Sequence, residues 1–146
     1  TLNEFVYDII YNNYLEIYDA DTWRPYCHVQ DFAQAIEKTI KYLSNKKSHS
    51  VNIFNIGSDK NNYTKRQIGN FLKKKFNEAK IVFKPSTVDA RNYRVNFSKA
   101  KKILNFKPKF GLNKGINELL NFIISNKKKF RNKKLFGNYE IKKKFL

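Results

Sequence analysis

The sequence predicts one mixed α/β domain, because segments with the two-residue period of strands alternate with segments that have the period of helices. The chain has 146 residues, enough for one domain and too few for two of ordinary size. Hydrophobic residues make up 41% of it and aromatic residues 16%, so it can build a core despite a formal charge of +18. This composition excludes a fully disordered chain.

The first predicted element is a helix at the N-terminus, with apolar residues on one face: Leu2, Phe5, Val6, Ile9 and Ile10. It begins without a Met or a capping residue, as in a piece cut from a longer protein. Residues 15–18 alternate as in a strand, and residues 19–22 follow as a turn. Tyr26–Val29 is expected to be a second short extended piece.

A helix is predicted from Asp31 onward, with its apolar face formed by Phe32, Ala35, Ile36, Ile40 and Leu43. Residues 51–56 are β-branched and aromatic and should form a buried strand that ends at Gly57. Thr64 and Gln67 have the spacing of a capping box, which predicts a helix behind them. Residues 81–83 read as a further strand that Pro85 ends.

The remaining elements are an extended piece and two helices. Tyr93–Val95 is expected to be extended, and Ser98 is expected to cap a short helix that Pro108 ends. The last helix has a regular amphipathic pattern, formed by Leu112, Ile116, Leu119, Leu120, Ile123 and Ile124.

The positive charge is concentrated in the basic tail, residues 127–146, which holds nine Lys or Arg and one acidic residue. Such a tail can bind nucleic acid through phosphate contacts, with its aromatic residues stacked on bases. The alternative is a general enrichment in Lys, Asn, Ile, Phe and Tyr that leaves the lysines on a solvated surface. The preference for Lys over Arg favours this alternative, because Lys makes no bidentate base contacts.

Several classes of protein are excluded by what the sequence lacks. No apolar run is long enough for a membrane-spanning helix, and the N-terminus does not resemble a signal peptide. The single cysteine, Cys27, excludes a disulfide framework and a multi-cysteine zinc site. We therefore expect a cytoplasmic protein without a metal site.

Three stretches, in order and spacing, resemble the extended short-chain dehydrogenase/reductases, the family of NAD-dependent sugar-nucleotide epimerases and dehydratases. Residues 23–36 (WRPYCHVQDFAQAI) are similar to that family's Arg–aromatic–His–Val–x–Asp segment. Residues 54–58 (FNIGS) are similar to a strand end in the family. Residues 89–108 (DARNYRVNFSKAKKILNFKP) are similar to its Asp-x-x-x-Tyr, Ser-Lys-Ala and Leu-Gly-aromatic-x-Pro segments, with Asn105 in place of the usual Gly.

The resemblance implies the C-terminal part of a Rossmann-type fold, with the last sheet strands and a small α/β substrate-binding lid. It divides the chain into a substrate-binding portion, residues 1–126, and the basic tail. In the family, the Arg that opens the first motif reaches the substrate diphosphate, and that position is Arg24. A second diphosphate Arg stands at Ser86 in some branches and at Arg91 in others, so Arg91 is expected here. Asp89 and Tyr93 match positions near the nucleotide.

The other motif residues are expected to be scaffold. The resemblance assigns His28 to the packed strand-to-helix junction rather than to catalysis, although a histidine titrates near neutrality. Asp31 is expected to cap its helix, and Asn55 and Gly57 to shape the end of a strand.

The parts that carry the family's chemistry are missing from this chain. A dinucleotide binds at a Gly-x-x-Gly-x-x-Gly turn, and a Tyr-x-x-x-Lys pair moves the proton during hydride transfer. The five glycines here are scattered, and the Tyr139–Lys143 match lies in the Lys-rich tail. We therefore expect no catalytic, metal or cofactor-binding residue in this chain, which alone should be inactive.

The resulting hypothesis is a substrate-side fragment of an NAD(P)-dependent isomerase or lyase. Its expected partners are a nucleotide sugar and the missing N-terminal half, with a homodimer when complete. Two alternatives remain open. One is a non-enzymatic module that binds nucleic acid through its Lys-rich tail, and the other is a structural or regulatory protein that kept the lid fold and lost its cofactor half.

Overall fold

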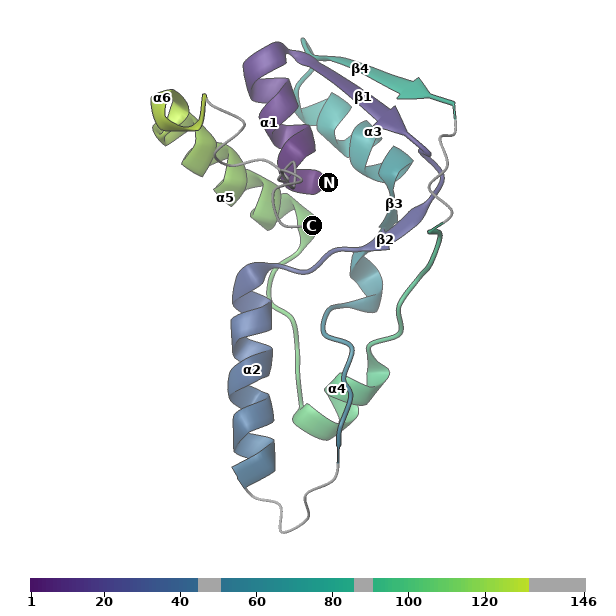
Figure 1. Ribbon diagram of the computed structural model, residues 1–146, viewed down its shortest axis with the longest axis vertical. Helices are drawn as coiled ribbons and strands as arrows, with labels where there is room; N and C mark the ends of the chain where they lie inside the picture. Colours follow the sequence, from purple (N-terminus) through teal and green to yellow (C-terminus); the bar gives the residue numbers. More distant parts are fainter. Residues whose placement is uncertain (45–50, 86–90, 132–146) are drawn as a thin grey trace, which may run out of the picture.

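The computed structural model describes residues 1–44, 51–85 and 91–131, which form a mixed α/β arrangement (Figure 1). In chain order the elements are α1 (Leu2–Asn12), β1 (Tyr14–Tyr18), β2 (Trp23–Pro25), α2 (Val29–Ser44), the 3-10 turn η1 (Asp59–Asn61), β3 (Asn62–Thr64), α3 (Lys65–Lys75), β4 (Lys80–Lys84), α4 (Ser98–Leu104), α5 (Leu112–Ser125) and α6 (Lys127–Phe130). None of the described helices has the length and apolar character needed to cross a membrane.

The described strands form two small sheets. β1 and β4 pair in parallel, with Leu15 opposite Ile81 and Ile17 opposite Phe83. β2 and β3 pair in antiparallel fashion, with Arg24 opposite Tyr63. The parallel pair is joined through α3, as expected where a crossover connects parallel strands.

The main core lies between the parallel pair, α1, α3 and α5, which gather in the upper part of Figure 1. Val6, Ile17, Ile68, Leu72 and Ile116 are fully buried there. α3 approaches the sheet closely, because a Cβ on Gly69 would stand 2.6 Å from the Cδ1 atom of Ile17. The core therefore needs a residue without a side chain at this position.

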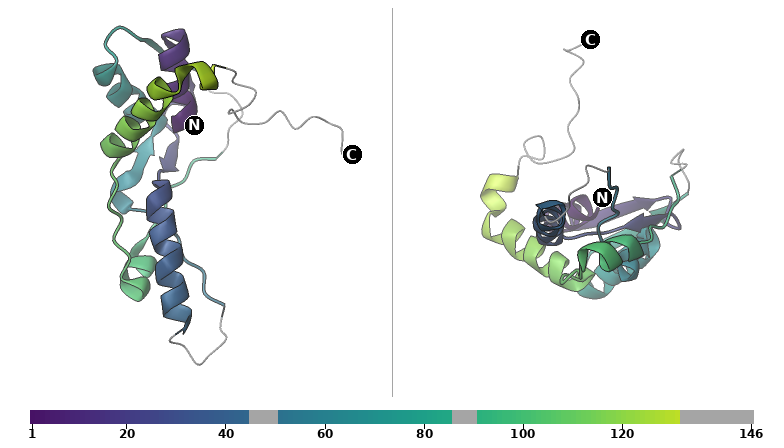
Figure 2. Two further views of the ribbon diagram at one scale, coloured as in Figure 1. Left: turned by 90° about the vertical axis from the view of Figure 1, so that its left-hand side faces the viewer. Right: turned by 90° about the horizontal axis from the view of Figure 1, so that it is seen from below.

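A second, smaller core joins α2 to α4 in the lower part of Figure 1, and Figure 2 shows the two helices from other sides. It consists of Ala35, Ala100, Leu104 and Phe106, with Phe54 and Ile56 packed against them. α4 ends at Asn105, whose φ of 46° is left-handed. This conformation explains the departure from Gly, because Asn is the residue that tolerates it next best.

Most elements predicted from the sequence are confirmed, among them the N-terminal helix, the strand at 15–18 and the capping box at Thr64. Three details are wrong. The strand expected at Tyr26–Val29 lies earlier, at Trp23–Pro25, because its pairing with β3 sets its position and α2 already begins at Val29. Ser98 does not cap α4, since Asn96 Oδ1 accepts the Ser98 amide at 2.9 Å.

The third difference concerns residues 51–56, which belong to neither of the two sheets in the described part of the chain. The segment has the alternating burial of a strand, but neither sheet supplies a neighbouring strand to pair with it. A strand exists only through its partner's hydrogen bonds, which the sequence of one strand cannot guarantee.

Candidate functional site

A large pocket of about 1090 Å³ lies where the start of α1, the segment from β2 into α2, residues 54–56 and the start of α5 come together. Its wall is mainly aromatic, formed by Tyr26, Phe32, Phe54, Tyr93, Phe97, Phe110 and Phe122. Arg24 is the cationic residue of this wall. The combination of apolar surface with one fixed cation is typical of a small-molecule site.

Arg24 is held in place from two sides. Its Nη1 atom donates a hydrogen bond to the Trp23 carbonyl at 2.7 Å and another to the Arg91 carbonyl. Its guanidinium lies over the Tyr93 ring, 5.5 Å from the ring centroid. Contacts to a carbonyl and to an aromatic face fix the plane of the guanidinium, which a bidentate contact with an anion requires.

Three of the four residues predicted to bind substrate are therefore brought together. Arg24 and Tyr93 line the pocket, while Arg91 is exposed and meets Arg24 through its backbone carbonyl. Arg91 is not among the residues that line the pocket. Asp89, and Ser86 with it, lie outside the described residues.

The segment that carries Tyr93 is fastened to β2 and β3 by asparagine side chains. Asn62 donates to the Val95 carbonyl at 3.0 Å and accepts from the Val95 amide at 3.0 Å, as a neighbouring strand would. Asn92 accepts the Trp23 amide at 2.9 Å. Sequence analysis missed these residues, and the only signal was an Asn in a run between a loop and a helix.

A second cation–aromatic pair lies beside the first. The Arg94 guanidinium lies 4.5 Å from the centre of the Trp23 ring, so the dipeptides Trp23–Arg24 and Tyr93–Arg94 stack crosswise. Arg94 was also missed, because only the fold shows that it reaches Trp23.

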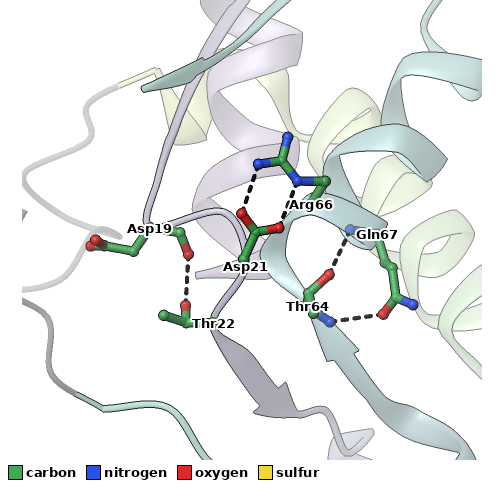
Figure 3. Close-up of polar contacts among 6 residues, drawn as sticks. All are labelled: Asp19, Asp21, Thr22, Thr64, Arg66 and Gln67. Carbon is green, nitrogen blue, oxygen red and sulfur yellow. Dashed lines mark hydrogen bonds and ion pairs between the residues drawn. The ribbon is translucent and has the colours of Figure 1, made fainter. Parts of the chain in front are cut away.

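The turn that delivers the chain into β2 is fastened to the start of α3 (Figure 3). The Asp21 carboxylate accepts two hydrogen bonds from Arg66, at 2.7 and 2.8 Å, and the pair lowers the pKa of Asp21. Thr64 Oγ1 accepts the Gln67 amide at 3.1 Å, and the Gln67 side chain accepts the Thr64 amide at 2.9 Å. Because Thr64 pairs with Trp23, the helix cap also positions β2.

His28 is packed rather than free to act as a base. Its ring stacks on Phe110, with centroids 4.2 Å apart and planes 10° apart. Its Nε2 atom lies 3.0 Å from Glu118 Oε2, and its Nδ1 atom accepts the Gln30 amide at 3.2 Å. Both ring nitrogens are thus engaged, which favours the scaffold interpretation.

Cys27 and Tyr26 are neutral at physiological pH. Burial, with a smaller contribution from Asp31, raises the pKa of the Cys27 thiol to about 11. Burial raises the pKa of Tyr26 to about 12 against the opposing effect of Arg24. Neither group supplies a reactive anion, and within the described ranges no three His, Cys, Asp or Glu residues are clustered to hold a metal.

Asp31 and Gly57 shape the ground around the pocket. The Asp31 carboxylate is buried and accepts the amides of Lys109 at 2.8 Å and Phe110 at 3.2 Å. Its partners therefore lie in the loop before α5, not at the start of its own helix as expected. A Cβ on Gly57 would stand 2.7 Å from the Phe97 ring, so the 54–57 segment can approach Phe97 only with a glycine there.

Comparison with known proteins gives the same fold. No family model matches the sequence, and no curated protein matches it. Among solved structures, the UDP-glucose 4-epimerase of Thermotoga maritima, determined with UDP-glucose, is 25% identical with a TM-score of 0.70. The alignment covers 86% of this chain and 39% of that one.

Two further neighbours show how broad the fold is. The UDP-glucose 4-epimerase of Bifidobacterium longum, determined in complex with NAD+ and UDP, is 19% identical with a TM-score of 0.67, and 86% of this chain covers 38% of it. The L-threonine dehydrogenase of Phytophthora infestans is 18% identical with a TM-score of 0.71, and 84% of this chain covers 40% of it. The chain thus spans about two fifths of the length of these structures. It has the α/β fold of the extended short-chain dehydrogenase/reductases, of which it forms the C-terminal part.

Proposed function

We propose that the chain is the substrate-binding part of an NAD(P)-dependent sugar-nucleotide epimerase or dehydratase. The observation that carries the proposal is Arg24, fixed by the Arg91 carbonyl and the Tyr93 ring at the wall of a largely aromatic pocket. The titles of two structural neighbours name UDP-glucose and UDP as bound molecules, which supports the same ligand class.

A nucleotide diphosphate suits this pocket for physical reasons. Its two phosphate groups need a fixed planar cation, and Arg supplies two parallel N–H donors where Lys supplies one point charge. The aromatic wall offers apolar surface to the base and sugar rings. The neutral Tyr26 and Cys27 add no negative charge that would repel the diphosphate.

In this proposal Arg24 is the first diphosphate contact and Tyr93 orients it. Arg91 stays the second candidate, and its side chain would have to turn toward the pocket that its carbonyl already adjoins. Asp89 completes the predicted set at a position beyond the described residues.

The nicotinamide cofactor belongs to the part of the fold outside this chain. Nothing here resembles the glycine-rich turn that seats a dinucleotide, so these residues do not fit it. When bound there, NAD(P) would accept and return a hydride. The role left to this chain is to bind the nucleotide sugar, orient it and shield it from water.

The fold alone does not select the substrate, because L-threonine dehydrogenase shares it. The test is therefore a titration of the 146-residue chain with UDP-glucose, UDP and L-threonine, followed by NMR chemical-shift changes. We expect both uridine nucleotides to bind and L-threonine not to. Removal of a charge-assisted hydrogen bond predicts that Arg24→Ala weakens UDP binding by about tenfold or more.

Arg131→Ala is the matched control, because it removes the same charge from an exposed position outside the pocket. If Arg24→Ala and Arg131→Ala weakened UDP binding equally, the attraction would be general and the proposed contact would be wrong. Binding of L-threonine alone would assign the pocket to a different substrate class.

The basic tail has no part in this proposal. Its described beginning is fastened to α1, since Tyr11 donates to the Lys127 carbonyl at 2.7 Å and Tyr7 to the Arg131 carbonyl at 3.1 Å. Residues 132–146 lie outside the described part. Binding of a single-stranded oligonucleotide that falls steeply with salt and disappears without residues 127–146 would instead support the nucleic-acid alternative.

A further inference from the structure

One face of α2 is apolar and uncovered. We call it the outer face of α2, and it consists of Val29, Phe32, Ile36, Ile40 and Leu43 at helical spacing. Ile36 and Ile40 are 61% and 59% exposed. The buried residues of this helix, Asp31 and Ala35, lie on a different side. An apolar stripe of this length is usual where a helix packs on a partner.

The extended segment 51–56 is uncovered in a complementary way. Val51 and Ile53 are 91% and 75% exposed, while Phe54 and Ile56 pack on the small core. The alternation is that of a strand with one side covered. Because the segment belongs to neither described sheet, it presents a strand-like edge that a partner strand can pair with.

The two features belong to one surface. α2 and segment 51–56 touch through Tyr42 and Phe54, whose ring centres are 6.1 Å apart. At its other end the outer face of α2 runs into the pocket, because Val29 and Phe32 line both. Whatever covers this surface also closes one side of the pocket.

We propose that this surface docks the part of the epimerase fold that this chain does not contain. The partner adds a β-strand alongside residues 51–56 and lays an apolar sheet face against Ile36 and Ile40. The solved structures supply the reason, since this chain matches only 38% to 40% of their length and the rest of that fold must meet it somewhere. The inference rests on the proposed function only in requiring that the whole fold exists.

A second copy of this chain is the less suitable occupant. Each copy carries a formal charge of +18, so two copies repel each other at long range. The outer face of α2 has no charged residue among its five members to offset that repulsion. Strand addition from a complementary part meets neither difficulty.

The test places the photo-crosslinking amino acid p-benzoylphenylalanine at position 40, in the protein expressed from its own gene, and identifies the crosslinked peptide by mass spectrometry. The expected product joins Ile40's position to a polypeptide region that carries a glycine-rich dinucleotide turn, whether in the same polypeptide or in a second one. The same amino acid at position 41 is the matched control, because Lys41 is exposed on the polar side of the same helix. We expect no such product there.

Two further readouts make each outcome decisive. Ile36→Lys should abolish the crosslink from position 40 while the circular dichroism of the chain is unchanged, and the amides of residues 51–56 should exchange at least about tenfold more slowly in the complex than in the isolated chain. A crosslink to a second copy, to an unrelated protein or to nothing would overturn the proposal. The UDP titration is independent of this result, so a failure of docking is distinguishable from a failure of the proposed function.

Discussion

The carboxylate of Asp31 accepts a 2.8 Å hydrogen bond from the backbone amide of Lys109, across 78 positions of the chain. This bond, with that from the Phe110 amide, ties the first turn of α2 to the loop that precedes α5. Phe110 in turn stacks on His28, so one buried carboxylate holds together the aromatic floor of the pocket.

Asp31→Ala should therefore destabilise the chain strongly. Asp31 is 1% exposed, and its removal leaves two amides without an acceptor in the interior. The expected loss in the free energy of unfolding is about 2–4 kcal/mol, because unpaired buried donors lose their full hydration. Asp31→Asn keeps one acceptor oxygen and should lose less. Urea denaturation of both variants measures the difference, and equal losses would contradict the double-acceptor role.

Local signals predicted what local physics decides. The amphipathic stripe of α1 and the Thr64–Gln67 spacing each depend on residues within a few positions, and both elements form as expected. The motif around Arg24 likewise placed that residue correctly beside Tyr93, on the strength of its resemblance to a family.

Contacts across the chain were beyond the reach of the same reasoning. The strand β2 begins at Trp23 because β3 pairs with it there, and nothing near Trp23 announces that register. Asn62 reads as an ordinary turn residue until the fold places it beside Val95. Segment 51–56 has the residues of a strand, yet strand formation depends on a partner that its own sequence does not contain.

The carboxylate of Glu16 makes the stability of the β1 strand depend on pH. Tyr14 and Tyr18 donate to its two oxygens at 2.5 and 2.7 Å, and these hydrogen bonds, with a smaller contribution from Lys84, lower the pKa of Glu16. A lowered folded-state pKa adds stability above the ordinary glutamate value, and this stability is lost as the pH falls through the folded value.

The wild-type chain should therefore be more stable than Glu16→Gln at neutral pH, and the difference should shrink as the pH falls below about 4. Thermal unfolding of both proteins across that range checks it. The tyrosines give the opposite limb, because the same contacts raise the pKa of Tyr14 and Tyr18 above 10.0 and their contribution is lost as the pH rises through the raised values. A pH-independent difference would show that the cluster has no role in stability.

Gly57→Ala should destabilise the chain by about 1–3 kcal/mol through overpacking. The added Cβ would stand 2.7 Å from two ring carbons of Phe97, which is itself 5% exposed and has little room to move. Gly111→Ala is the matched control, because no atom lies within 4 Å of the Cβ it would add. It should change the stability by about 0.5 kcal/mol, the scale of a weak N-cap effect. Equal denaturation midpoints for the two variants would rule out the close approach at Phe97.

The Asn62 side chain offers a test of how the Arg24 site is supported, because it touches the scaffold and lies outside the pocket lining. Its amide group makes three hydrogen bonds, one of them to the Asp59 carbonyl at 3.2 Å and two to the Val95 backbone. Asn62→Ala should cost about 2 kcal/mol in the free energy of unfolding and release the segment that carries Tyr93. Under the proposed function, UDP binding then weakens in a protein that is still folded and retains Arg24.

Asn62→Asp separates positioning from folding. An aspartate still accepts the Val95 amide but cannot donate to the carbonyls of Val95 and Asp59, so both stability and UDP affinity should fall between those of the wild type and Asn62→Ala. Asn121→Ala, at an exposed position of α5, provides the control for loss of an amide side chain. If UDP affinity followed none of these steps while stability did, the segment that bears Tyr93 would have no influence on the ligand, and Arg24 would act without its aromatic support.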